Sequence, residues 1–123
     1  MDLENFYQKL LEVLQHSTLH QGTWQMLETQ PAWDSNWTWD SFIAFAWENE
    51  PAPCLVGVVN YSAIQSQCYL RLPCEDLPGK LVNLIDLFSG QVYERSGDDL
   101  LNAGLYLDLP AWSYHLFEVR ISG

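Results

Sequence analysis

Apolar residues near the start of the chain recur every three or four positions, which is the spacing of one face of an α-helix. Polar residues fill the positions between them, and Asp2 is well placed to cap the first turn. The pattern therefore predicts an amphipathic helix within residues 1–20. Its apolar face consists of Leu3, Phe6, Tyr7, Leu10, Leu11 and Leu14.

Beyond Gly22 the helical spacing gives way to short apolar stretches separated by turn residues, which is typical of β-strands. Residues 55–60 are rich in valine and show little polar alternation, so we expect a central strand that is covered on both faces. The predicted strands are 23–28, 41–48, 55–60, 66–72, 81–86, 91–94, 105–109 and 113–120.

About eight short strands with frequent turns predict an all-β fold, an antiparallel β-sandwich with Greek-key-like connections. A chain of 123 residues has the length of one domain. We therefore predict two parts, an amphipathic helix at 1–20 and a β-sandwich domain at 21–123.

The charge balance limits the partners of the chain. Five Lys and Arg face 16 Asp and Glu, for a formal net charge of −11. This argues against nucleic acid, whose binding needs clustered basic residues, and against docking on anionic lipid. No apolar run approaches the length of a membrane span, and the start, Met1-Asp2-Leu3-Glu4, shows no signal-peptide pattern.

The cysteines and histidines carry no recognised motif. Three cysteines without CxxC spacing indicate reduced thiols, so we expect a cytoplasmic protein. His115 is interpreted as a hydrogen-bonded structural histidine in the last strand. His16 and His20 are spaced as paired metal ligands can be, but we interpret them as a solvated helix end.

Catalytic motifs are likewise absent from the sequence. It contains no phosphate-binding glycine loop, no metal-ligand spacing and no nucleophile elbow. We therefore predict no catalytic residue, no metal site and no cofactor. The many carboxylates are interpreted as a solvated face that keeps the domain soluble.

Three of the six tryptophans, Trp33, Trp37 and Trp39, lie within seven residues, with Asp and Asn between them. Such a segment suits carbohydrate binding, because indole rings stack on the C–H groups of sugars while polar side chains bind the hydroxyls. The alternative, which we prefer, is that the rings cap one end of the sandwich or pack against a neighbouring domain.

A series of short motifs follows the predicted elements in order. They are Phe6-Tyr7-x-x-Leu10-Leu11, Leu19-x-x-Gly22-x-Trp24, Phe42-Ile43-Ala44-Phe45-Ala46, Leu55-Val56-Gly57-Val58-Val59-Asn60-Tyr61-Ser62, Asp86-Leu87-Phe88-Ser89-Gly90 and Leu107-Asp108-Leu109-Pro110-Ala111-Trp112-Ser113-Tyr114-His115-Leu116-Phe117. Over nearly its whole length the chain resembles the end of an α-amylase-family enzyme, glycoside hydrolase family 13: the last barrel helix followed by the C-terminal all-β domain.

The resemblance implies a non-catalytic accessory domain, cut from a longer enzyme that acts on α-glucans. The family's catalytic carboxylates lie on barrel strands that this chain lacks, so none is carried over. The implied partner is the catalytic (β/α)8 barrel, on which the apolar face of the helix would pack. Asn60, Ser62 and the turn from Asp86 to Gly90 match positions that we interpret as structural.

Two other functions stay open at this point. The segment from Trp33 to Trp39 matches no pattern of the family, and its rings make a carbohydrate-binding module for α-glucan the alternative function. A free-standing domain that holds a protein partner through the helix face is a third possibility.

Overall fold

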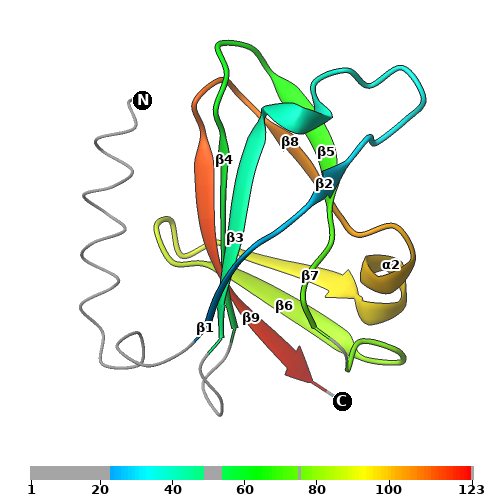
Figure 1. Cartoon of the computed structure of the whole chain (residues 1–123). Helices are drawn as coiled ribbons and strands as arrows, with labels where there is room; N and C mark the ends of the chain where they lie inside the picture. Colours follow the sequence, from blue (N-terminus) through cyan, green and yellow to red (C-terminus); the bar gives the residue numbers. More distant parts are fainter. Residues whose placement is uncertain (1–22, 49–53, 75, 123) are drawn as a thin grey trace.

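The protein is described by a computed structural model that covers residues 23–48, 54–74 and 76–122 (Figure 1). The helix predicted at 1–20 lies outside the described residues. So does its apolar face of Leu3, Phe6, Tyr7, Leu10, Leu11 and Leu14.

The described residues form an antiparallel β-sandwich of two sheets, which confirms the predicted fold class. The larger sheet has six strands in the order β1 (Thr23–Met26), β3 (Phe42–Glu48), β4 (Cys54–Asn60), β9 (Tyr114–Ser122), β6 (Leu81–Asp86) and β7 (Val92–Ser96). The smaller sheet has the order β2 (Thr29–Gln30), β5 (Ser66–Leu70) and β8 (Leu105–Leu109).

The hydrophobic core lies between the two sheets. In β8 the side chains alternate strictly, with the three leucines buried and Tyr106 and Asp108 exposed, as expected of a strand with one face on the core. In β4 five consecutive residues, Val56 to Asn60, are buried. Since successive side chains of a strand point to opposite faces, β4 is covered on both faces, and it lies between β3 and β9 as predicted.

The first predicted strand, 23–28, is two residues too long, since β1 ends at Met26. β2 was not predicted: it pairs with β5 of the smaller sheet, whereas β1 pairs with β3 of the larger one. The chain crosses from one layer to the other between Met26 and Thr29 (Figure 1). The described residues therefore hold nine strands instead of eight.

Two short helices were not predicted. The 3-10 helix η2 (Trp39–Ser41) leads into β3, and α2 (Gly97–Asn102) joins β7 to β8. Gly97 starts α2 where the chain passes very close to Leu77, since a Cβ atom there would lie 1.9 Å from the Leu77 carbonyl oxygen. A glycine is needed at this position because of that close approach.

Candidate functional site

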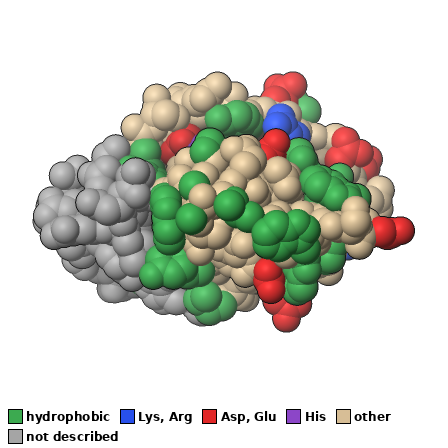
Figure 2. All heavy atoms as spheres, turned by 90° about the horizontal axis from the view of Figure 1, so that it is seen from above, with side chains coloured by type: hydrophobic (Ala, Val, Ile, Leu, Met, Phe, Trp, Pro, Cys, Tyr) green, Lys and Arg blue, Asp and Glu red, His purple; other side chains and the backbone are tan. Residues whose placement is uncertain are grey.

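The tryptophan segment is only partly exposed. Trp37 is 74% exposed and Trp33 47%, whereas Trp39 packs against the core from η2. Two of the three rings thus remain on the surface, where they can contact a ligand, and the third serves packing. Figure 2 looks onto the end of the sandwich that is uppermost in Figure 1, and it shows hydrophobic side chains gathered in patches there.

The backbone that carries these rings is held by a buried asparagine. Asn36 accepts a hydrogen bond from the Ala32 N–H at 2.9 Å and donates one to the Thr38 hydroxyl at 3.0 Å. The Thr38 oxygen in turn accepts the Gln67 N–H of β5 at 3.1 Å. A loop fixed in this way loses little further freedom on binding, so Trp33 and Trp37 are presented on a preorganised support.

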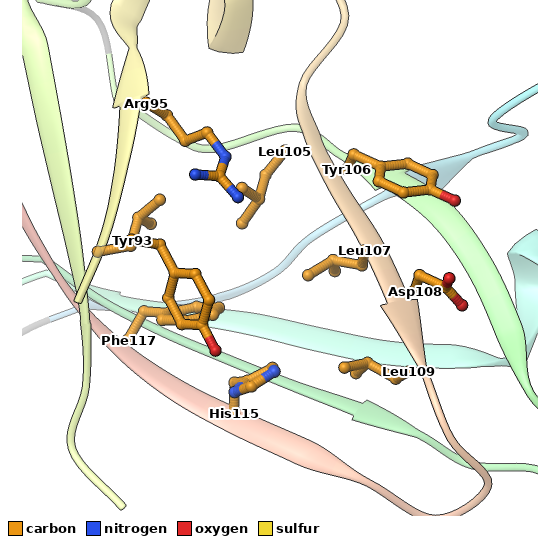
Figure 3. Close-up of a pocket in the computed structure, with 10 residues that line it drawn as sticks. Tyr93, Arg95, Leu105, Tyr106, Leu107, Asp108, Leu109, His115 and Phe117 are labelled. Atoms are coloured by element: carbon orange, nitrogen blue, oxygen red, sulfur yellow. The ribbon is translucent and has the colours of Figure 1, made fainter. Parts of the chain in front are cut away.

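A hollow of about 160 Å³ lies between the two sheets (Figure 3). Leu105, Leu107 and Leu109 of β8 form one side of it. Figure 3 shows Tyr93, Arg95 and His115 directed into the space from the larger sheet, while Tyr106 and Asp108 point away from it. The hollow is small and mostly apolar, with a few polar groups at its rim.

His115 in this hollow forms a pair with Asp86 at the end of β6. The His115 Nδ1 atom lies 2.8 Å from Oδ2 of Asp86, and Asp86 is 3% exposed. The carboxylate also accepts the Phe88 N–H at 3.0 Å and the Ser89 hydroxyl at 3.1 Å. His115 is thus hydrogen-bonded, as the sequence interpretation expected.

The electrostatics of Asp86 favour its ionised form. Burial alone raises the pKa of this carboxyl group, but the hydrogen bonds from His115, Phe88 and Ser89 together outweigh burial and lower it. The pair joins the turn after β6 to β9.

Another group of hydrogen bonds is built on Asn60, which is 0% exposed at the end of β4. Its Nδ2 atom lies 3.0 Å from the carbonyl oxygens of both Leu109 and Pro110, and 2.9 Å from that of Ile64. Its Oδ1 atom accepts the Ser62 hydroxyl at 2.8 Å. Asn60 therefore fastens the end of β4 to the corner that connects β8 with β9.

An aromatic pair on the outer face of the smaller sheet was missed at the sequence level. Tyr69 of β5 and Tyr106 of β8 are directly opposite in register, with ring centroids 5.6 Å apart. Beside them, Asp108 accepts hydrogen bonds from Gln65 and Gln67. The alternation of residues 105–109 indicates that Tyr106 and Asp108 face outward, but their partners follow only from the strand register.

The three cysteines differ in burial. Cys54, at the start of β4, and Cys74, after β5, are half-buried, whereas Cys68 is fully buried in the core. Burial raises the pKa of Cys68 to about 12. Cys68 is therefore an inert packing residue.

Metal-binding clusters and membrane-spanning helices are both missing from the described part of the chain. Within residues 23–48, 54–74 and 76–122, no three His, Cys, Asp or Glu side chains come close enough together to hold a metal ion. No helix in these ranges has the length and hydropathy needed to cross a membrane.

Neither the known protein-family models nor the curated proteins include a match to this sequence. The resemblance to the C-terminal domain of α-amylase-family enzymes therefore stays a prediction. The function has to be inferred from the residues and their geometry.

Proposed function

We propose that the chain is the non-catalytic C-terminal accessory β-domain of an α-amylase-family glycoside hydrolase or transglycosidase that acts on α-glucans. In this proposal it packs against the catalytic (β/α)8 barrel and stabilises it, in the cytoplasm. The observation that carries the proposal is that Asn60 and Asp86, two residues of the motifs behind the resemblance, are buried and hydrogen-bonded at corners of the sandwich.

The hydrogen bonds of Asn60 support a structural role for the motif Asn60-x-Ser62. Asn60 is fully buried, and its amide and carbonyl groups contact the turn after β4 and the corner at Pro110. A side chain whose polar atoms are all engaged inside the protein has none left for a substrate. The Asn60 side chain therefore joins the turn at Ser62 to the corner at Pro110.

The hydrogen bonds of Asp86 likewise support a structural role for the motif from Asp86 to Gly90. The Asp86 carboxylate closes the turn through Phe88 and Ser89, and the Gly90 N–H donates to the Asp86 carbonyl at 2.7 Å. Gly90 has a φ of 79°, which favours glycine. The turn therefore needs Asp at its start and Gly at its end, as the resemblance implies.

The predicted helix at 1–20 supplies the contact with the barrel in this proposal. Its apolar face would be buried against the catalytic domain, since an apolar stripe of six large residues gains free energy when it leaves water. No catalytic residue, metal or cofactor is assigned to the chain. Its contribution to carbohydrate metabolism is to support the enzyme that carries it.

The proposal is tested by incubating the purified chain with soluble starch and maltooligosaccharides and measuring the release of reducing ends. We expect no release above the protein-free blank, while an added α-amylase gives a rapid signal in the same mixture. Turnover that increases in proportion to the concentration of the chain would overturn the proposal.

A second candidate function, α-glucan binding, is favoured by the exposure of Trp33 and Trp37 on a held loop. Titration of maltoheptaose against tryptophan fluorescence tests it. Quenching that is lost in Trp37→Ala but kept in Trp39→Phe, whose parent ring packs inward, would support glycan binding. An unchanged spectrum at millimolar ligand removes this candidate.

A further inference from the structure

The hollow between the two sheets lies at the open side of the sandwich. β7 is the last strand of the larger sheet and β8 is the last strand of the smaller one. The lining of the hollow comes chiefly from these two edge strands and from β9 (Figure 3). A ligand that enters between the two edges therefore breaks no strand pairing of either sheet.

The walls of the hollow are mostly apolar, and their rings hold one another in place. Three leucines of β8 form one side. On the other side, the rings of Tyr93 and Phe117 make an edge-on contact at a centroid distance of 5.9 Å, and the His115 imidazole stacks on Phe117 at 4.8 Å. Such packed rings lose little freedom when a ligand binds. The volume of about 160 Å³ suits a body of one aromatic ring, since an apolar cavity of about 150 Å³ binds benzene.

Arg95 brings a positive charge to this space. It lies on the same face of β7 as Tyr93, because alternate residues of a strand share a face, and Figure 3 shows its guanidinium directed into the hollow. One of its N–H groups donates to the Glu94 carbonyl at 2.8 Å. Asp99 of α2 lines an adjoining hollow together with Arg95, yet neither of the two ion pairs found among the described residues includes Arg95. Most of its five N–H donors are therefore left for a ligand or for solvent.

The acidic residue that lines the hollow does not neutralise this charge. Asp108 of β8 points away from the space, and its carboxylate accepts hydrogen bonds from Gln65 at 2.7 Å and from Gln67 at 3.0 Å (Figure 3). The Asp86 carboxylate is likewise engaged, by His115 at 2.8 Å. The charged group that faces the hollow is thus complementary to an anion.

We propose that the hollow binds a small aromatic monocarboxylate. Its carboxylate pairs with the Arg95 guanidinium, and its ring lies between the leucines of β8 and the rings of Tyr93 and Phe117. A carboxylate fits because its two oxygens match the planar fork of a guanidinium. A phosphate fits less well, because its second charge is repelled by a chain with a net charge of −11. The proposal is independent of the accessory-domain function, because it requires neither a barrel nor a glycan.

The exposed position of Arg95 divides the site into a wet part and a dry part. The charge pair stays in contact with water, so its formation carries only a small desolvation penalty. The ring of the ligand leaves water and gains free energy against the apolar walls. A ligand that lacks either the ring or the charge should therefore bind more weakly than one that has both.

The test titrates benzoate into the ¹⁵N-labelled full chain at constant pH and ionic strength and follows the amide signals by NMR. We expect saturable shifts that centre on Arg95, Leu107 and Phe117. Acetate, which lacks the ring, and benzyl alcohol, which lacks the charge, should each bind at least about tenfold more weakly. The absence of saturable shifts with benzoate, or equal binding of either analogue, would overturn the proposal.

A substitution separates this site from a purely protective role of Arg95, because an inward-pointing charge on an edge strand also discourages pairing with other chains. Arg95→Gln keeps much of the side chain and should weaken benzoate binding about tenfold, to the level of benzyl alcohol. Arg120→Gln, which removes another exposed arginine, is the matched control and should leave benzoate binding unchanged. Dispersed amide signals check that both variants are folded. Equal benzoate affinity in the parent chain and in Arg95→Gln would contradict the proposal.

Discussion

The corner built on Asn60 and the loop at 31–38 each contain a buried asparagine and a nearby tryptophan, yet they use them differently. At the corner, the Trp112 ring contacts the ring of Tyr61 edge-on at a centroid distance of 5.2 Å and is partly buried. In the loop, Asn36 fixes the backbone but Trp37 remains 74% exposed.

This difference separates a structural role from a role in recognition. The groups of the corner are satisfied inside the protein, so their chemistry is complete without a ligand. In the loop, the hydrogen bonds of Asn36 hold the backbone, while the rings of Trp33 and Trp37 stay exposed, which is the arrangement of a preorganised contact surface. Substitutions at the corner should therefore change stability, and substitutions of the exposed rings should change only binding.

The largest effect is expected from Asn60→Ala. The substitution leaves the buried carbonyl group of Leu109 and the partly buried one of Pro110 without their donor, which should lower the free energy of unfolding by about 3 kcal/mol. Asn36→Ala, which removes bonds within one loop, should cost only about 1 kcal/mol. Urea denaturation of both variants compares them, and equal losses would show that the corner is no more important than the loop.

The stability contributed by the hydrogen-bonded Asp86 carboxylate is expected to depend on pH. The folded pKa of Asp86 is lowered, so its contribution is complete above the unfolded value of about 3.9 and is lost as the pH falls through the lower folded value. Asp86→Asn should therefore lower the melting temperature at neutral pH, and the difference from the parent should shrink in acid.

The matched control for this pH dependence is Asp76→Asn, which changes an exposed carboxylate. Thermal melts of the three chains from neutral pH down to strong acid provide the measurement. If the penalty of Asp86→Asn were constant over this range, the carboxylate would not stabilise the fold through its charge.

A smaller effect is expected from Trp112, which has a φ of 61° in the left-handed region. Trp112→Ala should cost about 2 kcal/mol, because the contact with Tyr61 is lost while the unfavourable backbone conformation remains. Trp112→Gly should be less destabilising than Trp112→Ala by about 1 kcal/mol, since glycine adopts this φ readily. Equal stability of the two variants would mean that the backbone conformation carries no strain.

The smallest effect is expected from Trp37→Ala, which should change the free energy of unfolding by less than about 0.5 kcal/mol, as is usual for exposed residues. Differential scanning calorimetry measures it against the parent chain. A loss as large as that of Trp112→Ala would place Trp37 in a packed environment and remove the contrast between the two regions.

Local patterns in the sequence predicted much of the fold. The strands at 81–86 and 105–109 were predicted with the bounds that the structure has, because turn residues flank both and apolar alternation marks 105–109. The change of sheet between Met26 and Thr29 was not predictable, since alternation does not reveal which sheet a strand joins. The six residues of α2 are too few to show a helical period.

Predicting the candidate sites depended more strongly on contacts between residues that lie far apart in the sequence. The Leu109 partner of Asn60 lies 49 residues away, and the His115 partner of Asp86 lies 29 residues away. Similarly, an odd number of cysteines indicated reduced thiols, but the full burial of Cys68 and the partial burial of Cys54 and Cys74 follow only from the fold. The types of these residues were visible in the sequence, whereas their partners required the fold.

The proposal that this chain is the accessory β-domain of an α-amylase-family enzyme can be tested by reading the coding sequence immediately upstream of Met1. We expect an open frame that continues into a (β/α)8 barrel with the family's catalytic carboxylates. An in-frame stop codon followed by unrelated sequence, or a fused domain of another kind, would contradict it.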